Sequence, residues 1–135
     1  MRHFSLVLLL GLAACAGPQT LICTGAQRAG TVVELFFGRN IGGRLGVGDE
    51  AWRQFLATEV TPRFPDGVTV VDAAGQWRDR ARGVIVLEPS KVMIVVLPDD
   101  AASQARLDAI VDAYKRRFRQ QSVGVVSLPA CVGFQ

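Results

Sequence analysis

The order in which strand-like and helix-like segments follow one another limits this chain to few folds. A β-branched and aromatic run at 31–37 predicts a strand, and a glycine-rich loop at 38–48 leads to a helix capped by Asp49. A strand at 68–71 continues through 75–78 after a kink, and the apolar stretch 84–97 forms one bent strand or two. A second helix starts at 98–100, and the last strand spans 123–128.

This order, β-α-β-β-α-β, predicts an α+β fold of the ferredoxin-like type, in which two helices cover one face of a four-stranded antiparallel sheet. The first and last strands are antiparallel neighbours in that topology. A length of 135 residues suits one domain with a sizeable core, and we assign residues 31–135 to it.

The run VMIVVL at 92–97 is apolar on both faces of a strand and lacks the alternation of a half-exposed strand. Two helices can bury only one of these faces. We therefore expect a second subunit, a ligand or other segments of the chain to cover the open face of the sheet. Depending on register, Met93 or Val95 is expected to lie on that face.

Residues 1–14 have the features of a secretory signal peptide. Positive charge at 1–3 precedes an apolar run at 4–11, and small residues follow. The apolar run is too short to span a bilayer as a helix, which needs about 20 residues.

The sequence LAAC at 12–15 resembles the bacterial lipobox, in which cleavage leaves a lipid-modified cysteine, here Cys15, as the new N-terminus. Two or three acyl chains anchor a protein firmly to a membrane, whereas one chain anchors it marginally. The next residue is Ala16 rather than Asp, which favours the outer membrane of the cell envelope, with the protein facing the periplasm. Residues 15–30 are expected to form a tether. The alternative is an ordinary signal peptide cut near Ala14 or Ala16.

Cys23 and Cys131 remain in the mature chain, one before the first strand and one after the last. The periplasm is oxidising, and the predicted topology brings both residues to the same corner of the sheet. We therefore expect a disulfide between them, and two reduced thiols are the alternative.

Histidine is almost absent, because the only one, His3, lies in the expected signal peptide. A mature chain without histidine has no Ser-His-Asp triad, no Cys-His pair and no His-ligated metal site. We therefore expect neither a metal nor a cofactor. The net charge of +3 and the lack of a dense basic run do not indicate nucleic-acid binding.

Arginines and a tryptophan are candidate binding residues. Arg63 lies in the block TPRFPDG at 61–67, which is either a rigid corner between helix and strand or a stiff loop that clamps an anionic group. Trp77 and Arg78 point to opposite faces of a strand. Trp77 therefore lies either in the core or on the open face, where its ring would be a stacking platform.

Two carboxylates, Glu34 and Glu88, lie in otherwise apolar strands and need a partner or a proton if they are buried. Arg39, Arg63 and Arg78 are the available partners. One interpretation is an internal salt bridge that holds the fold. The other is a carboxylate poised for proton transfer.

Several blocks of sequence, together and in order, resemble the bacterial family catalogued as domain of unknown function 3574. The blocks are FFGR at 36–39, WRQFL at 52–56, VTPRFPDG at 60–67, GQWR at 75–78, EPSKV at 88–92 and the segment 114–123. The resemblance covers residues 34–134 and leaves out the glycine-rich segment 40–48. It implies a small secreted protein or lipoprotein, and it assigns no catalytic residue because the family has no established activity.

We therefore expect a lipid-anchored periplasmic module that binds a ligand or a protein through its sheet face, with a homodimer or an envelope protein as partner. The alternative is a small cofactor-free enzyme that uses Glu88 or Glu34 with arginines. A flat apolar face favours a protein interface. A cavity in which Glu88 and an arginine converge favours an enzyme or a ligand-binding protein.

Overall fold

The computed structural model of the protein describes residues 21–98 and 100–133, so the expected signal peptide and Cys15 lie outside the described residues. A π-helical turn, η1 (Leu56–Val60), continues the first helix. The other elements are β1 (Arg28–Gly38), β2 (Asn40–Ile41), β3 (Arg44–Leu45), α1 (Asp49–Phe55), β4 (Thr69–Asp79), β5 (Val84–Pro98), α2 (Ala101–Phe118) and β6 (Gly124–Val132).

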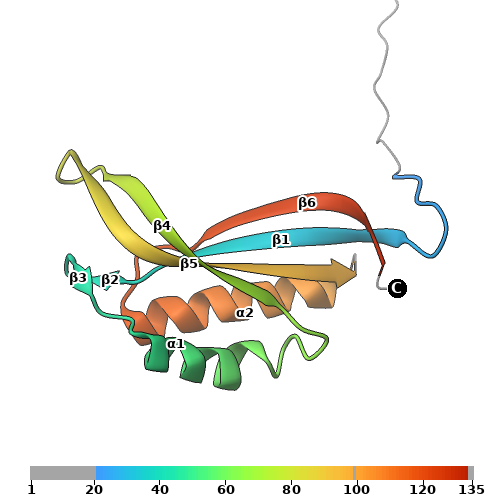
Figure 1. Ribbon diagram of the computed structural model, residues 1–135, viewed down its shortest axis with the longest axis horizontal. Helices are drawn as coiled ribbons and strands as arrows, with labels where there is room; N and C mark the ends of the chain where they lie inside the picture. The colour runs from blue at the N-terminus through green and yellow to red at the C-terminus, as the bar shows by residue number, and fades with distance from the viewer. Residues whose placement is uncertain (1–20, 99, 134–135) are drawn as a thin grey trace, which may run out of the picture.

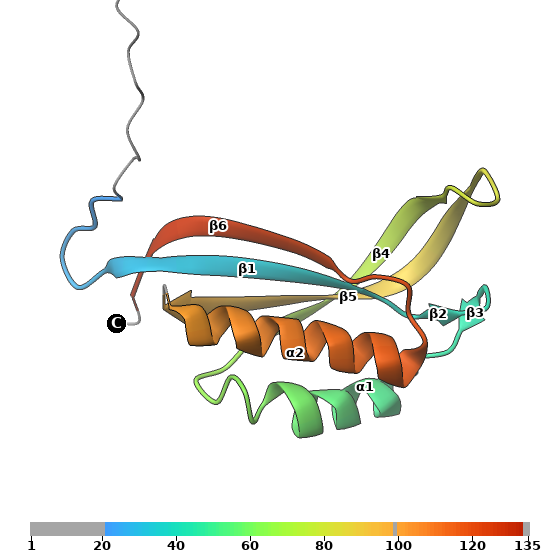
Figure 2. The ribbon, with the colours of Figure 1, turned by 180° about the vertical axis from the view of Figure 1, so that it is seen from behind.

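The main sheet is antiparallel, with the strand order β4-β5-β1-β6. Helices α1 and α2 lie side by side on one face of this sheet, and no described segment covers the other face (Figure 1 and Figure 2). This arrangement confirms the predicted ferredoxin-like fold. Strands β2 and β3 form a separate small hairpin within the glycine-rich loop, with Gly42 and Gly43 at positive φ in its turn.

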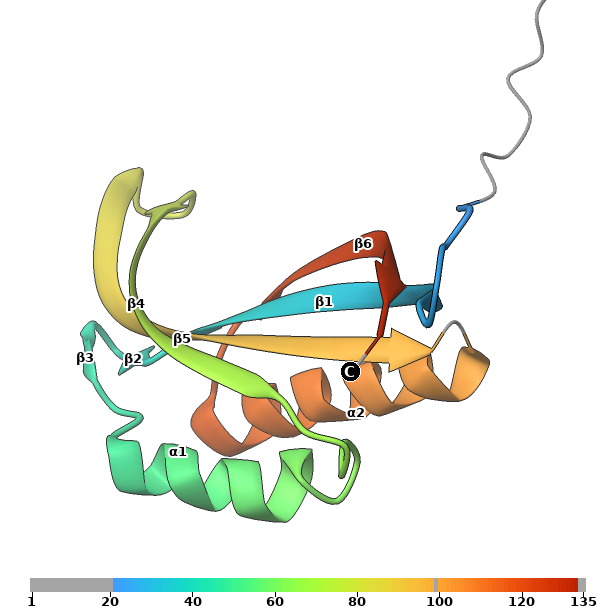
Figure 3. The same ribbon diagram turned by 45° about the vertical axis from the view of Figure 1, so that its right-hand side comes forward.

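Strand β5 is one continuous strand, which settles the choice between one strand and two. Its pairing with β1 ends where Ser90 faces Gly38, whereas its pairing with β4 continues to Val84. The far part of the β4–β5 hairpin therefore extends beyond the rest of the sheet. Figure 3 shows this part curling away from the helices, toward the uncovered face.

The core lies between the sheet and the two helices. Odd-numbered residues of the two central strands face the helices and are buried: Val33, Leu35, Phe37, Met93, Val95 and Leu97. The prediction that Met93 or Val95 lies on the open face is therefore wrong. The apolar run had no alternation from which the register could be read, and the open face takes the even-numbered Val92, Ile94 and Val96 instead.

Aromatic side chains fill the centre of this core. The ring of Phe37 on β1 lies 4.7 Å from that of Tyr114 on α2, and the two rings meet edge to face. Trp52 and Phe55 of α1 contact both of these rings. Each buried aromatic side chain contributes about 1.5–3 kcal/mol through burial, and edge-to-face pairs add about 0.5–1.5 kcal/mol each.

The two helices begin differently. Asp100 caps α2, because its carboxylate accepts a hydrogen bond from the Ser103 N–H at 2.6 Å. Asp49, expected to be the cap of α1, is instead its first helical residue, and Gly48 occupies the cap position without a side-chain hydrogen bond. The carboxylate of Asp49 is held by Arg39 at 2.7 Å rather than by backbone N–H groups.

Strand β1 begins at Arg28 rather than at residue 31, because pairing with β6 extends as far as Arg28 and Val132. The same pairing places Ala29 opposite Cys131. The predicted disulfide is confirmed: Cys23 and Cys131 are bonded, with a Cα–Cα distance of 5.4 Å. The bond fixes the segment before β1 to the end of the edge strand β6.

We expect loss of this disulfide to destabilise the domain strongly. The bond closes a loop with a sequence separation of 108 residues, so the chain-entropy model predicts a stabilisation of about 4–5 kcal/mol. The double variant Cys23→Ser/Cys131→Ser should lower the free energy of unfolding by an amount of that order in urea titrations. An unchanged free energy of unfolding, or a non-reduced peptide map without a Cys23–Cys131 link, would contradict this prediction.

Candidate functional site

The uncovered side of the sheet, called here the open face, is largely apolar. Even-numbered residues of β1, β5 and β6 and odd-numbered residues of β4 share it, as their pairing shows. Its exposed large apolar side chains are Phe36, Val71, Trp77, Val84, Val126 and Leu128, and its half-buried ones are Val32, Val92, Ile94 and Val96. Apolar side chains that gather on one face in this way usually mark an interface or a binding groove.

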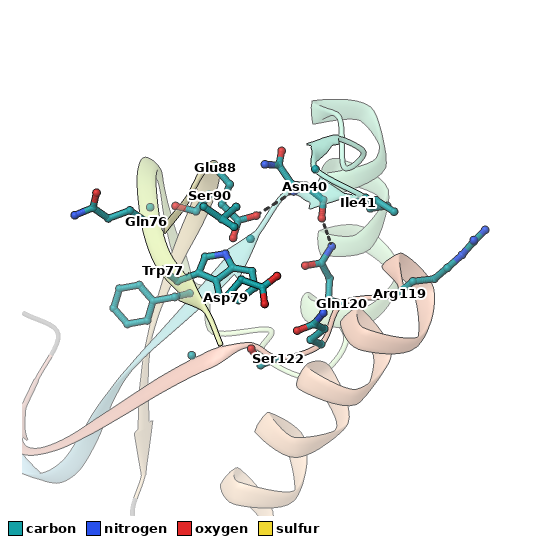
Figure 4. Close-up of a pocket in the computed structure, with 18 of the residues that line it drawn as sticks. Asn40, Ile41, Gln76, Trp77, Asp79, Glu88, Ser90, Arg119, Gln120 and Ser122 are labelled. Carbon is teal, nitrogen blue, oxygen red and sulfur yellow. Dashed lines mark hydrogen bonds between the residues drawn. The ribbon is translucent and has the colours of Figure 1, made fainter. Parts of the chain in front are cut away.

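At one end of the open face the curled hairpin encloses a hollow of about 670 Å³, called here the hairpin cleft. Strands β4 and β5 form one wall, and β2 with the connection between α2 and β6 forms the other (Figure 4). A hollow of this volume lies within the usual range for small-molecule sites, about 300–1,000 Å³.

Trp77 and Phe36 supply the aromatic surface of the cleft. Trp77 projects from β4 into the hollow (Figure 4), and its side chain is on the open face rather than in the core. Arg78, the next residue, is on the opposite face and does not line the cleft. Of the two placements considered for Trp77, the structure has the one that leaves the ring available for stacking.

Glu88 lies on the floor of the cleft, opposite Gly75 on the neighbouring strand. One carboxylate oxygen, Oε2, accepts a hydrogen bond from the Asn40 N–H at 3.2 Å. The Asn40 carbonyl in turn accepts from Gln120 Nε2 at 2.8 Å, which ties the end of α2 to β2 (Figure 4). Gly38 makes room for the carboxylate, because a Cβ at that position would lie 2.7 Å from Glu88 Oε1.

The other charged groups around the cleft are paired or point outward. Asp79 accepts hydrogen bonds from the N–H groups of Ala81 and Arg82 and from Arg82 Nε at 2.6 Å. These hydrogen bonds, chiefly those from Arg82, hold the pKa of Asp79 below its usual range and close the hairpin turn. Arg119 lies at the rim and points away from the hollow in Figure 4.

Two of the three arginines considered as partners of Glu34 and Glu88 are engaged elsewhere, and the third, Arg78, is on the opposite face of β4. Arg39 is buried on the helix side and donates to Asp49 and to the carbonyl of Val47. Arg63 donates to the side chain and carbonyl of Glu59 one helical turn earlier, as expected for a rigid corner. Within the described residues, no arginine forms a salt bridge with either glutamate.

Glu34 lies apart from the cleft, in the middle of the open face. It is opposite Ile94 on one side and Val126 on the other, and it is half-buried between these apolar strands. A carboxylate in this position is partly exposed and would need a hydrogen-bond donor if another surface covered the face.

Sequence reasoning missed one charged cluster, on the helix side of the sheet. The buried Arg39 and Lys91 share the carboxylates of Asp49 and Asp72, with Lys91 Nζ 3.5 Å from Asp49 and in direct contact with Asp72. Arg39 first, and then Lys91, hold the pKa of Asp49 below its usual range. The cluster joins α1, β4 and β5, and its signal in the sequence was only a lysine next to an apolar run.

Tyr114 is a further titratable group whose pKa is shifted. Its hydroxyl donates a hydrogen bond to the Gly38 carbonyl at 2.8 Å, and burial raises its pKa above the usual range. A phenol held in this state is a structural donor rather than an acid or base at neutral pH.

Among residues 21–98 and 100–133, no group of three or more histidine, cysteine, aspartate or glutamate side chains is arranged to hold a metal ion. In the same part of the chain, no helix is long and apolar enough to cross a membrane.

Comparison with solved structures supports the class of protein that this geometry defines, an α+β domain of the ferredoxin-like type. A phage SAM lyase in complex with S-methyl-5'-thioadenosine matches with a TM-score of 0.62 and 17% identity, over 84% of this chain and 95% of that chain. A phage SAM lyase in the apo state matches with a TM-score of 0.55 and 16% identity, over 87% of this chain and 99% of that chain. CutA1 from Oryza sativa gives 0.52 and 14%, over 82% and 87%. At these identities the likeness concerns the fold alone.

The family model described as "Protein of unknown function (DUF3574)" matches residues 32–134. The chain belongs to this family, which confirms the resemblance found in its sequence blocks. No curated protein matches the chain.

The Asp49 cluster predicts how stability depends on pH. In the unfolded chain the pKa of Asp49 returns to about 3.9, above its value in the folded protein, so the unfolded state binds the proton first as the pH falls. The stabilisation from this carboxylate is therefore complete above about pH 4 and is lost as the pH falls through the lower folded pKa. Urea midpoints measured at pH 7 and pH 3 should show a smaller acid-induced decrease for Asp49→Asn than for the wild type.

Asp66→Asn is the matched control, because Asp66 lies in an exposed turn and forms no salt bridge within the described residues. An acid-induced decrease that is the same in the wild type, Asp49→Asn and Asp66→Asn would show that the cluster does not contribute through Asp49.

Proposed function

We propose that this protein is a lipid-anchored module of the bacterial cell envelope that acts by binding through the open face of its sheet, where a second copy of the chain packs. The observation that carries the proposal is the line of exposed and half-buried apolar side chains across that face, from Val71 and Ile94 to Val126 and Leu128. Burial of such a surface stabilises a complex by about 25 cal/mol per Å² of apolar area removed from water.

The edge strand β6 supports this proposal further. Val126 and Leu128 remain exposed on its open-face side although β6 is fully paired with β1. Glu34, at the centre of the face, requires that the covering surface bring a hydrogen-bond donor to it.

The proposed anchor fits the position of the fold's first described residues. The chain enters β1 at the end of the sheet opposite the curled hairpin (Figure 1), and the Cys23–Cys131 bond holds it there. The eight residues from Ala16 to Cys23 span at most about 29 Å when extended. A lipid on Cys15 would therefore keep the domain close to the membrane, with the hairpin at the distal end.

The proposed anchor predicts a change of location. Cys15→Ser removes the thiol that would carry the lipid, so the protein should move from the membrane fraction to the soluble periplasmic fraction. Thr20→Ser is the control, because it leaves both the lipobox and the Cys23–Cys131 disulfide intact. Sedimentation of Cys15→Ser with the membranes, to the same extent as the wild type, would refute acylation.

Self-association through the open face predicts opposite outcomes for two neighbouring substitutions on β6. Val125 and Val126 are 46% and 42% exposed, and they point to opposite faces of the strand. A charge at Val126 would have to be desolvated in the interface, so Val126→Asp should shift the protein to monomer in analytical ultracentrifugation. Val125→Asp should leave the association unchanged.

The strand β5 supplies a second pair that separates association from folding. Ile94→Asp places a charge on the open face and should abolish association while helical circular dichroism is retained. Met93→Asp places the same charge in the core, where the side chain is fully buried, and should unfold the domain. A wild-type protein that is monomeric at all concentrations would contradict the proposed self-association.

A further inference from the structure

The hairpin cleft has features of a small-molecule site that an apolar protein interface does not require. Phe36 and Trp77 expose 39% and 40% of their surfaces beside a polar hollow. A tryptophan ring that is open on one face binds flat, polarisable groups well, because stacking excludes water and depends little on the identity of the ring.

Glu88 supplies the polar recognition group. Its Oε2 is fixed by the Asn40 N–H, and no hydrogen bond within the described part of the chain occupies Oε1. The Asn40–Gln120 hydrogen bond supports the backbone that holds this carboxylate, so the group is oriented before a ligand arrives. An oriented carboxylate oxygen without a donor favours a ligand that brings an N–H group.

The charged groups around the cleft indicate which class of ligand it can bind. Asp79 and Arg82 neutralise each other in the hairpin turn, and Arg119 points away from the hollow. Glu88 is therefore the charge in the cleft that lacks a counter-ion in the described structure, and it disfavours a phosphate or carboxylate beside it.

The spacing of the two groups suits one ligand that contacts both. Trp77 lies opposite Val86 and Glu88 lies opposite Gly75, so the two side chains are diagonal neighbours on one face of the hairpin. Diagonal neighbours are about 7–8 Å apart at the backbone, within reach of large side chains. Gly75, directly opposite Glu88, has no side chain to fill the space beside Trp77. A Cβ at this position would lie 3.4 Å from Ser90 Oγ.

We propose that the hairpin cleft binds a small molecule with a flat nitrogen heterocycle and an amino group, with the ring stacked on Trp77 and the amino group donating to Glu88. This inference does not depend on the proposed self-association, because it uses Trp77 and Glu88 in the cleft and none of the residues from which the self-association was argued.

The test uses the mature protein in detergent and three probes in isothermal titration calorimetry. Adenosine carries the ring and the amino group, purine riboside carries the same ring without the amino group, and cyclohexylamine carries an amino group without a flat ring. We expect adenosine to bind at micromolar to millimolar concentration, purine riboside about tenfold more weakly, and cyclohexylamine not measurably.

Variants separate the two contacts. Trp77→Ala should weaken adenosine binding about tenfold or more, and Trp77→Phe should restore part of it because a ring remains. Glu88→Leu should remove the preference for adenosine over purine riboside, while stacking still binds both. Ile85→Ala is the matched control, because Ile85 is exposed on the other face of the same hairpin and should not change binding.

The exposure of Trp77 makes the alanine variant compatible with folding, and thermal unfolding of each variant checks this. The proposal is overturned if adenosine does not bind the wild type at millimolar concentration. It is also overturned if adenosine and purine riboside bind equally, or if folded Trp77→Ala and Glu88→Leu bind adenosine as the wild type does.

Discussion

The contact between Phe37 and Tyr114 is the interaction on which the rest of the structure depends. It joins a central strand of the sheet to α2, and the Tyr114 hydroxyl reinforces it with a hydrogen bond to the Gly38 carbonyl. Trp52 and Phe55 of α1 pack against the same two rings. Both helices are therefore held on one face of the sheet. No described segment covers the other face.

Gly38 connects this core to the hairpin cleft. Its carbonyl accepts the Tyr114 hydrogen bond on the helix side, and the absence of a side chain leaves space for Glu88 on the open side. One residue beyond it, Arg39 enters the charged cluster that holds the start of α1 against the sheet. Two consecutive residues at the end of β1 therefore contact the core, the cleft and the first helix. Gly38 contacts the core and the cleft, and Arg39 contacts the start of α1.

The candidate site was partly predictable. Glu88 stood out because a carboxylate in an otherwise apolar strand needs a partner or a proton if it is buried. Trp77 stood out because its ring could lie in the core or on the open face, and the structure brings both residues to one cleft. The arginines expected to accompany them lie elsewhere. Arg39 pairs with Asp49 and Arg63 pairs with Glu59, each a neighbour close in the chain. Such local pairs form at a lower entropic cost than contacts across the sheet.

The sequence by itself determined the succession of strands and helices, the ferredoxin-like topology and the disulfide. These follow from residue periodicity and from the few ways in which short connections can join such elements. Only the tertiary structure decided which face of β5 is buried, since a run without alternation has no preferred side until a helix packs on it. It also decided the cleft, because the curl of the β4–β5 hairpin beyond β1 brings Glu88 and Trp77 opposite the end of α2. The approach of the hairpin to the end of α2 depends on contacts between segments that are far apart in the sequence. No local sequence pattern predicts such contacts.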